Sequence, residues 1–301
     1  MQLVFIHPEP HSAEGEAVPP HEVVALAAAA ERAGFGAYAF TEHPAPPAQW
    51  LTTAGHQTLD PFVALGFVAA ATTRIRLVTT LSIAAYRNPA LLAKTAASVD
   101  FLSGGRLVLG LGAGYLEGEF AALGADFAER GRLLDEALEV LPLHWSGEPF
   151  SFEGRHFRAR DTMARPRPVQ QPIPMWIGGN SAASHRRVAT KAQGWMPLVG
   201  PPELSAIVGT PVFGSIDELA RSAAELRAAV AAAGRDPAAI DIIYPYAAAD
   251  IAAPGADVER HRDAFGELEA IGVTWVALSA GGMEHGAALE AIERLGESYA
   301  T

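Results

Sequence analysis

The chain of 301 residues is half hydrophobic, carries a formal net charge of −12 and contains no cysteine. This length suits one α/β barrel, which commonly takes roughly 250 residues. The absence of cysteine excludes disulfides, thiolate metal sites and cysteine nucleophiles, and it favours a cytoplasmic protein. The acidic balance argues against nucleic-acid binding, which needs a basic face. We expect no membrane span and no signal peptide, since apolar runs are short and the first residues lack a basic segment.

Strand-like and helix-like segments alternate along the whole chain. The strands are predicted at Leu3–Ile6, Ala37–Phe40, Arg76–Leu81, Leu107–Leu111, Met175–Ile177, Trp195–Val199, Ile240–Tyr244 and Thr274–Leu278. The helices are predicted at Glu22–Ala33, Pro61–Ala71, Pro89–Leu102, Arg132–Trp145, Ser181–Lys191, Ile216–Ala233, Val258–Ile271 and Ala287–Tyr299. Eight such pairs predict an α/β fold, a (β/α)8 TIM barrel formed by residues 1–301 as a single domain.

Residues typical of helix ends support this assignment. Asp60-Pro61 and Asn88-Pro89 each place a capping side chain before a proline at the first helical position. Alanine-rich helices are followed by glycines that suit a left-handed cap, at Gly34, Gly234 and Gly272.

Two connections are longer than a minimal barrel requires, so we expect insertion segments after strands 2 and 4. The first is Pro44–Leu59, and the second, Gly147–Pro174, contains a hairpin that turns at Glu153-Gly154. Long connections in compact domains are usually lids or binding loops.

Polar residues close the second predicted strand, as Thr41-Glu42-His43. Active sites of barrels lie at the carboxyl ends of the strands, where a carboxylate beside an imidazole could bind a polar ring edge or move a proton. The alternative is a capped strand end with a solvated Glu42. The residues alone leave both interpretations open.

Small residues mark the ends of the third and fourth predicted strands. The alternation of the third strand is lost at Ser82, which indicates either a bulge that offers its backbone to a flat ring or an ordinary loop. Gly110-Leu-Gly-Ala-Gly-Tyr115 lacks the complete glycine fingerprints of nucleotide-binding loops, so close packing of backbone and ligand is favoured there.

A glycine turn leads from the fifth strand directly into a helix, as Ile177-Gly178-Gly179-Asn180-Ser181. Backbone N–H groups at such a helix start bind phosphate well, although the same turn could be only a helix cap. Gly281-Gly282 is a second candidate for phosphate. The ten histidines show no metal-ligand spacing, so we expect no metal. His56 and His285 remain candidate site residues.

Together these segments resemble the bacterial luciferase-like family of flavin and deazaflavin oxidoreductases. The resemblance covers nearly the whole chain in order. Its motifs are Thr41-Glu-His, Tyr86-Arg-Asn-Pro-Ala-Leu-Leu-Ala-Lys94, Asp100-Phe-Leu-Ser-Gly-Gly-Arg-Leu-Val-Leu-Gly-Leu-Gly-Ala-Gly-Tyr115, Glu119-Phe, Arg130-Gly-Arg-Leu-Leu-Asp-Glu-Ala-Leu, Pro174-Met-Trp-Ile-Gly-Gly-Asn-Ser and Gly194-Trp-Met-Pro197. The branch that uses coenzyme F420 is favoured by Thr41-Glu-His-Pro-Ala-Pro-Pro and by Ala54-Gly-His-Gln-Thr-Leu-Asp-Pro61.

The resemblance implies where a cofactor would lie. The family carries a non-prolyl cis peptide at the end of the third strand, which we place at Leu81-Ser82, with a neighbouring bond as the alternative. The residues expected to bind the cofactor are Thr80, Leu81, Ser82, Ile83, Gly112, Gly114, Gly178, Gly179, Asn180 and Ser181. Glu42 and His43 would contact the ring edge and act with Tyr115 as the catalytic residues, while Trp50 and His56 would face the substrate. In the family's sugar-phosphate dehydrogenase a proton-donating glutamate occupies the position of Tyr115, so that activity is not expected to transfer.

The function implied is an F420-dependent oxidoreductase that transfers a hydride between deazaflavin C5 and an unidentified small organic substrate. One alternative is an FMN-dependent monooxygenase supplied with reduced flavin by a separate reductase. A minor alternative is a flavin-binding barrel without catalysis. Family habit also implies a homodimer, and the alanine- and glycine-rich helix Pro61–Ala71 suits close packing between subunits.

Overall fold

The computed structural model describes residues 1–9, 18–53, 55–281 and 283–300. Within these residues, eight parallel strands close into a barrel in which the last strand pairs with the first. In chain order they are β1 (Gln2–Ile6), β2 (Ala37–Phe40), β3 (Arg76–Thr79), β5 (Leu107–Gly112), β8 (Met175–Gly178), β9 (Gly194–Met196), β10 (Asp241–Pro245) and β11 (Trp275–Ser279). The predicted (β/α)8 fold is therefore confirmed.

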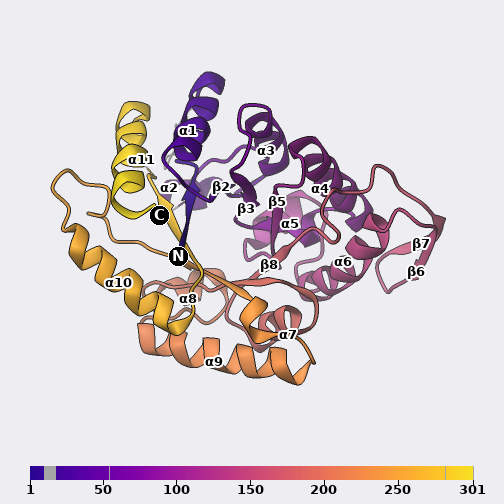
Figure 1. Cartoon of the computed structure of the whole chain (residues 1–301). Coiled ribbons are helices and arrows are strands. Elements are labelled where there is room, and N and C mark those ends of the chain that lie inside the picture. The colour runs from indigo at the N-terminus through magenta and orange to yellow at the C-terminus, as the bar shows by residue number, and fades with distance from the viewer. Residues whose placement is uncertain (10–17, 54, 282, 301) are drawn as a thin grey trace.

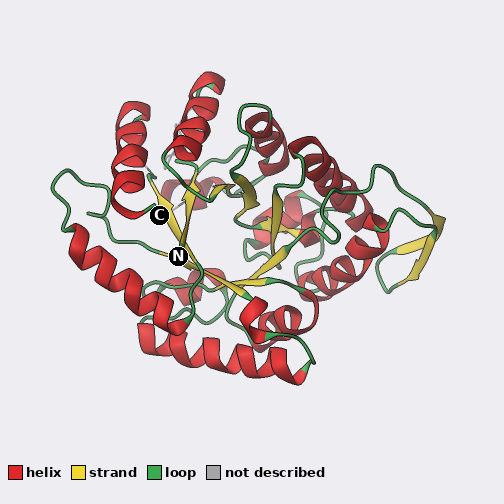
Figure 2. Cartoon of the chain, in the orientation of Figure 1, coloured by secondary structure: helices red, strands yellow, loops and turns green. Residues whose placement is uncertain are grey.

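Helices surround this barrel (Figures 1 and 2). The main ones are α1 (Pro20–Arg32), α3 (Pro61–Ala69), α4 (Pro89–Ser103), α6 (Arg130–Trp145), α7 (Ala182–Lys191), α9 (Ile216–Ala232), α10 (Val258–Ile271) and α11 (His285–Tyr299). Shorter elements lie in the connections: α2 (Ala48–Thr53), β4 (Ser82–Ile83), η1 (Ala84–Tyr86), α5 (Glu117–Ala122), β6 (Phe150–Glu153), β7 (Arg158–Thr162), α8 (Leu204–Val208) and η2 (Pro237–Ala239). None of the described helices has the length and apolar character needed to cross a membrane.

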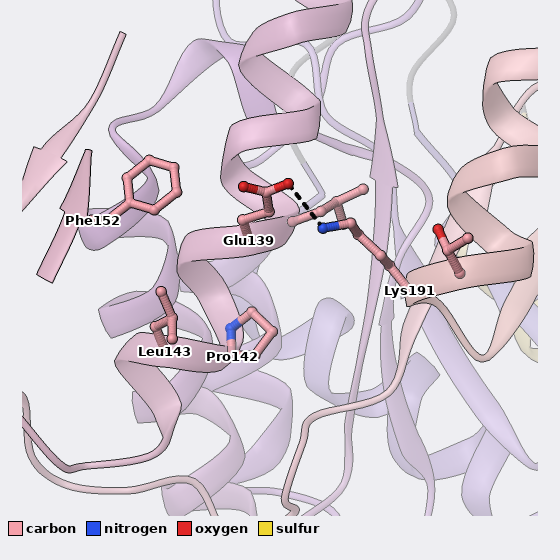
Figure 3. A pocket seen from close by; sticks show the side chains of 7 residues that line it. Glu139, Pro142, Leu143, Phe152 and Lys191 are labelled. Carbon is pink, nitrogen blue, oxygen red and sulfur yellow. Dashed lines mark hydrogen bonds and ion pairs between the residues drawn. The ribbon is translucent and has the colours of Figure 1, made fainter. Parts of the chain in front are cut away.

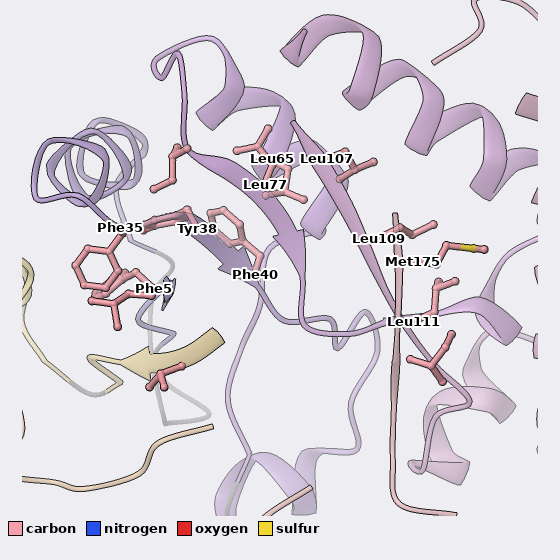
Figure 4. Close-up of a cluster of buried hydrophobic side chains, with 14 of the residues drawn as sticks. Phe5, Phe35, Tyr38, Phe40, Leu65, Leu77, Leu107, Leu109, Leu111 and Met175 are labelled. Atoms are coloured by element: carbon pink, nitrogen blue, oxygen red, sulfur yellow. The ribbon is translucent and has the colours of Figure 1, made fainter. Parts of the chain in front are cut away.

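The strands separate two buried layers, because successive side chains point to opposite faces. Leu107, Leu109 and Leu111 of β5 point outward into a large cluster shared with the helices (Figure 4). Val108 points inward to a smaller cluster whose buried members all come from strands. Gly110 and Gly112 follow Val108 on the inward face. Each fully buried leucine contributes about 1.5–3 kcal/mol to folding.

The predicted helix caps are confirmed in the structure. The Asp60 carboxylate accepts hydrogen bonds from the N–H groups of Phe62 and Val63, and Asn88 accepts one from Ala90. Gly34, Gly234 and Gly272 adopt positive φ angles of 89°, 74° and 92° at the ends of their helices.

Two predicted strands end more than one residue away from the position observed in the structure. The third was predicted to reach Leu81, but β3 ends at Thr79 and the chain starts a new strand at Ser82, which pairs with β5. The sixth was predicted at Trp195–Val199, but β9 spans Gly194–Met196. Pro197 follows directly and has no N–H group to continue the pairing.

The predicted hairpin is present as β6 and β7, joined by a turn in which the Gly154 N–H group donates to the Phe157 carbonyl. Its turn packs on α6, where Glu136 accepts hydrogen bonds from the N–H groups of residues 155–157. The hairpin projects outward at the edge of the molecule beyond α6 (Figure 1). The expectation of a lid or binding loop stays a prediction for this segment, in which Phe152 lines a hollow beside α6.

One carboxylate fixes the connection into β3. Glu31 of α1 accepts hydrogen bonds from the N–H groups of Thr73, Arg74 and Ile75 at 2.9, 2.6 and 2.8 Å, and from the Thr73 hydroxyl. Burial raises the pKa of Glu31, but these four donors favour the carboxylate and together lower the pKa to about 2.

We expect Glu31→Gln to reduce the free energy of unfolding by about 1–2 kcal/mol, a value reduced for the partial exposure of this side chain. The folded-state pKa lies below the ordinary value of 4.5. The contribution is therefore complete above pH 4.5 and is lost as the pH falls toward 2. Urea unfolding at pH 7 and pH 3 measures it, with Glu297→Gln on the exposed side of α11 as the control. An equal difference at both pH values would contradict the assignment.

Candidate active site

The candidate site lies at the mouth, which we define as the barrel end formed by the carboxyl ends of the strands and the connections that follow them. Neighbouring strands β2, β3, β5 and β8 contribute the polar and glycine motifs. Because all of them are parallel, their carboxyl ends meet at this mouth. The motifs predicted from separate parts of the sequence are thus brought to one side of one opening.

The connection after β3 contains the non-prolyl cis peptide, between Thr80 and Leu81. The preferred placement from the resemblance, Leu81-Ser82, is wrong by one residue, and the cis bond is the neighbouring bond that was the alternative. Ser82 and Ile83 already form β4, whose partners on β5 are Leu111 and Gly112. Thr80 still belongs to the end of β3, since its N–H group donates to the Phe40 carbonyl at 2.8 Å.

The side chain of Leu81 lies over inward-facing glycines at the ends of β5 and β8. A Cβ atom added to Gly112 would lie 3.1 Å from Leu81 Cδ1, and one added to Gly178 would lie 2.2 Å from the same atom. Glycine at these two positions therefore makes room for Leu81. The Leu81 side chain forms an apolar floor at the mouth and directly joins the third-strand motif to the fifth-strand motif.

Glu42 lies behind β2, facing away from the mouth. Its carboxylate accepts hydrogen bonds from the Ile83 N–H group at 2.7 Å and the Ser82 hydroxyl at 3.2 Å, and it forms an ion pair with Arg87. Burial raises the pKa of Glu42, while Arg87, Ile83 and Ser82 oppose this by favouring the carboxylate. Arg87 also pairs with Asp60 at 2.7 Å. Glu42 therefore fixes the connection that carries the floor.

His43 takes the opposite orientation and lies at the mouth, in contact with Glu119 of α5. His43 Nδ1 lies 3.2 Å from Glu119 Oε2, which also accepts a hydrogen bond from the Tyr86 hydroxyl at 2.8 Å. The second oxygen of Glu119 accepts from the Ala45 N–H group at 3.3 Å. A carboxylate only accepts, so His43 must donate through a protonated Nδ1. In the neutral ring, Nε2 is then the basic nitrogen.

Aromatic rings form a wall around His43. The ring centroids of Trp50, His56 and Tyr115 lie 4.3, 5.1 and 6.0 Å from that of His43. His56 Nε2 lies 3.1 Å from the Thr41 hydroxyl. Burial, and then the charge of Glu119, raise the pKa of Tyr115 to about 12, so this residue carries its proton at neutral pH. The structure thus groups Trp50, His56 and Tyr115 with His43, as the sequence placed them.

The glycine turn after β8 leads into α7 at the same mouth. Gly179 has a φ of 98°, and the Ser181 hydroxyl caps the helix by accepting from the Ser184 N–H group at 3.2 Å. The first turn of a helix presents N–H groups that suit an anion. The side chain of Asn180 serves another purpose, because it bonds to the N–H and carbonyl groups of Leu198 and to the Pro211 carbonyl.

The remaining predicted positions lie close by. Gly114 has a φ of 86°, and a Cβ added there would lie 2.8 Å from side-chain atoms of Ile83 and Phe120. His285 lies at the start of α11, and its Nδ1 atom is 3.4 Å from Glu22 Oε2 of α1. This histidine therefore takes part in the contact between α11 and α1. The rival phosphate motif includes Gly282, which is outside the described residues.

A second polar group lies behind β1 and β2, under the helices. His7 Nδ1 lies 2.7 Å from the Tyr38 hydroxyl, and burial lowers the pKa of His7 to about 4. Burial raises the pKa of Glu9 to about 8. At neutral pH the imidazole is uncharged and the carboxyl is mostly protonated. This group therefore carries little net charge and lies apart from the mouth.

Other features of the molecule do not compete with the mouth. A shallow hollow of about 400 Å³ lies between α6, α7 and the hairpin, crossed by an ion pair of Glu139 and Lys191 at 3.1 Å (Figure 3). It is on the outer surface of the helices, away from the strand ends. Among the described residues, no three or more side chains of the ligand-forming types are grouped to hold a metal ion.

Three residues of the site were not among the predicted site residues: Glu119, Tyr86 and Arg87. Glu119 is 1% exposed and lies in a short helix beside the buried Phe120. The only signal in the sequence is the Glu119-Phe120 pair shortly after the glycines of β5. The position of Arg87 beside Asn88-Pro89 gives no indication of its pairing with Glu42.

The fold is a TIM barrel whose mouth combines the apolar side chain of Leu81, the start of α7 and a histidine hydrogen-bonded to a carboxylate. The family model of the luciferase-like monooxygenases matches residues 1–294, and the chain belongs to this family. The family resemblance found in the sequence motifs is therefore confirmed.

Individual relatives are more distant. An uncharacterised protein of Mycobacterium tuberculosis (strain ATCC 25618 / H37Rv) is 35% identical over 141 residues, which are 46% of this chain and 50% of the relative. The F420-dependent glucose-6-phosphate dehydrogenase of Segniliparus rotundus is 30% identical over 63% of this chain and 56% of its own length. The chain thus spans about half the length of the curated relatives it matches. The crystal structure of monooxygenase RslO1 from Streptomyces bottropensis has a TM-score of 0.75 at 23% identity, covering 99% of this chain and 98% of that chain.

Proposed function

We propose that the protein is an F420-dependent oxidoreductase acting on a small organic substrate. The observation that carries the proposal is the contact of Leu81 with Gly112 and Gly178, which puts the apolar floor and the anion-binding turn in one mouth. A planar ring on this floor would have its charged tail near the start of α7. The F420-dependent relatives support the deazaflavin among the cofactors of this family.

The residues at the mouth fit such a cofactor. Thr80, Leu81 and the strand β4 would lie beneath the ring, and the glycines of β5 would flank it. The turn Gly178–Ser181 would hold the phosphate with backbone N–H groups and a hydroxyl. When bound, a deazaflavin supplies hydride transfer at C5.

The chain's own residues supply positioning and proton transfer. Glu119 holds His43 with its proton on Nδ1, which leaves Nε2 to accept a proton from a substrate hydroxyl or to return one. Tyr115 and Trp50 exclude water on the side of His43. Glu42 acts as a positioning residue, because its hydrogen bonds fix Ser82 and Ile83 next to the floor.

Fluorescence titration with oxidised F420 tests the proposal. We expect saturable quenching at micromolar concentration, and no binding at tens of micromolar would reject the deazaflavin. We expect His43→Ala to bind F420 and to lose at least about 100-fold in turnover. The control His21→Ala changes an exposed histidine of α1 and should leave both unchanged.

A second candidate is a monooxygenase that uses reduced FMN supplied by a separate reductase. The description of the matching family model favours it. Oxygen consumption with supplied reduced FMN distinguishes the two, because a deazaflavin has carbon in place of the N5 on which oxygen chemistry depends. A flavin-binding barrel without catalysis would bind the cofactor and turn over neither substrate nor oxygen.

We also propose that the protein forms a homodimer through α3 and α4. Exposed apolar side chains gather on these neighbouring helices, and they include Val63 at 73% exposure, Phe67 at 48% and Leu91 at 66%. Gly66 lies between the first two with open space above it. An apolar surface with a small residue at its centre suits a twofold contact with a second copy.

We expect Phe67→Glu to convert the dimer to a monomer, since a buried unpaired charge opposes association. Light scattering at micromolar concentration would then give half the wild-type mass. The control Leu143→Glu adds the same charge on α6, where the side chain is 37% exposed, and should leave the mass unchanged. A monomeric wild-type protein would contradict the proposal.

A further inference from the structure

The connections that follow the eight barrel strands are almost free of positive charge. Of the 22 lysines and arginines in the chain, Arg87 alone lies in these connections, which are residues 7–19, 41–60, 80–88, 113–129, 179–181, 197–215, 246–257 and 280–284. The described parts of these connections carry the acidic residues Glu42, Asp60, Glu117, Glu119, Asp126, Glu129, Glu203, Asp250, Asp257 and Glu284, while Glu9 after β1 is mostly protonated at neutral pH. Cations are therefore concentrated on the helices and at the opposite end of the barrel.

The single cation of these connections is already neutralised. Arg87 pairs with both Glu42 and Asp60 and lies against the ring of Phe62, with 5.2 Å between the guanidinium carbon and the ring centroid. This arrangement lies behind β2, on the side away from the mouth. Its charge is therefore not directed at a substrate.

Arginines in the first two turns of α6, α7 and α10 have partners as well. Arg132 pairs with Glu129 at 2.7 Å, and Arg187 pairs with Asp135 at 2.7 Å. Arg130 donates to the Phe127 carbonyl and lies over the ring of the same residue. On α10, Arg260 pairs with Asp250. These partners hold the guanidinium groups at the outer rim.

The described groups that face the mouth include no lysine or arginine. The floor is Leu81, the wall is made of Trp50, Tyr115 and His43, and the charged group nearest to them is the carboxylate of Glu119. An anionic substrate would lose its hydration here without gaining a cationic partner, which is strongly unfavourable. A carbonyl or alcohol oxygen needs only one hydrogen bond, which His43 or Tyr115 can provide.

We propose that the substrate is an uncharged, largely apolar alcohol or carbonyl compound, and that the mouth rejects phosphorylated and carboxylated substrates. This inference rests on the proposed function for the chemistry of the substrate. The charge of the mouth is measurable without any cofactor. The inference also separates this chain from the sugar-phosphate activity named for its relatives.

Tryptophan quenching measures the charge of the mouth directly. Four of the five tryptophans are buried, which leaves Trp50 as the one that solvent quenchers reach. We expect the quenching constant of iodide for Trp50 fluorescence to be at least about fivefold smaller than that of caesium. Each constant is first divided by the value that the same ion gives with free N-acetyltryptophanamide. Trp50→Phe should abolish the accessible fraction. Iodide quenching equal to or stronger than caesium quenching would overturn the inference.

A charge variant and a substrate pair complete the test. Ser279 is exposed at the end of β11 on the inward face, so Ser279→Arg should raise iodide quenching at least about twofold, while Ser279→Gln should not. With reduced F420 supplied as the hydride donor, methyl levulinate should be reduced at least about 100-fold faster than levulinate, measured as kcat/KM. Saturable quenching of Trp50 by glucose 6-phosphate below about 1 mM would overturn the inference. If F420 does not bind, the proposed function is rejected. The quenching measurements still test the charge of the mouth, because they need no cofactor.

Discussion

Replacing Glu119 by glutamine is expected to lower kcat/KM on the order of 10³-fold while the protein still folds. The carboxylate oxygen Oε2 accepts hydrogen bonds from both His43 Nδ1 and the Tyr86 hydroxyl. The other oxygen, Oε1, accepts from the Ala45 N–H group, so a glutamine that keeps this contact through its oxygen must place its NH2 group at the position of Oε2, toward both His43 and Tyr86. Nδ1 then becomes an acceptor and the proton moves to Nε2, which removes the base. In serine proteases, the equivalent change of the residue that orients the histidine costs about 10⁴-fold through the wrong tautomer.

Nitrogen NMR of His43 checks the mechanism independently of turnover, because the two tautomers have distinct ring-nitrogen shifts. We expect protonated Nδ1 in the wild type and protonated Nε2 in Glu119→Gln. The control Glu117→Gln changes an exposed residue of the same helix and should alter neither the tautomer nor kcat/KM. An unchanged tautomer together with full activity would show that Glu119 does not position His43.

Glu119→Ala should behave differently, because it leaves three donors without their acceptor: His43 Nδ1, the Tyr86 hydroxyl and the Ala45 N–H group. We expect it to reduce the free energy of unfolding by at least about 2–4 kcal/mol, since each unsatisfied group costs about 1–3 kcal/mol and partly exposed donors can bind water instead. Chemical denaturation measures this loss. A comparison of the two variants therefore separates the structural role of Glu119 from its effect on the histidine tautomer.

The barrel could be predicted because its strands and helices are local features of the sequence. Runs such as Leu3–Ile6 and Leu107–Leu111 are short, apolar and followed by helix-forming segments with capping residues. Such patterns depend on residues within one turn or one strand of each other. The parallel arrangement then places Thr41–His43, the third-strand connection and Gly178–Ser181 at the same end without further information.

The contacts that build the site were not predictable, because they join distant residues. Glu119 meets His43 across 76 positions, and Arg87 meets Glu42 across 45. Whether a side chain points into the mouth or behind a strand depends on where the strand begins. His43 and Glu42 are neighbours in sequence just beyond β2, yet His43 contacts Glu119 while Glu42 contacts Ser82, Ile83 and Arg87.

The glycines of β5 are a second case in which the sequence does not identify the contact partner. Their sequence indicates close approach of the backbone to a neighbour, which is correct, but it does not identify that neighbour. In the structure, the space beside Gly112 is taken by Leu81 and Ile83, and the space beside Gly110 by the Thr79 carbonyl. A ligand would meet these side chains first.

Gly110→Ala is expected to have the largest effect on stability. A Cβ atom at this position would lie 2.0 Å from the Thr79 carbonyl oxygen, a backbone atom that cannot rotate away. The same two residues are also joined by a hydrogen bond of 2.7 Å from the Thr79 hydroxyl to the Gly110 carbonyl. Separating β3 from β5 would disturb the floor above them. We expect a loss of at least about 3–5 kcal/mol in the free energy of unfolding.

Urea unfolding of the purified variants measures the effect, and Gly266→Ala is the matched control. Gly266 lies within α10 and has no heavy atom within 4 Å of an added Cβ, so the exchange should stabilise the protein by about 0.5–1 kcal/mol. The two glycine-to-alanine exchanges should therefore change the free energy of unfolding in opposite directions. This result would show that contact between strands, and not helix or strand propensity, decides the effect at Gly110. A Gly110→Ala protein within about 1 kcal/mol of wild type would mean that β3 and β5 can move apart, in which case Leu81 could not form a fixed floor.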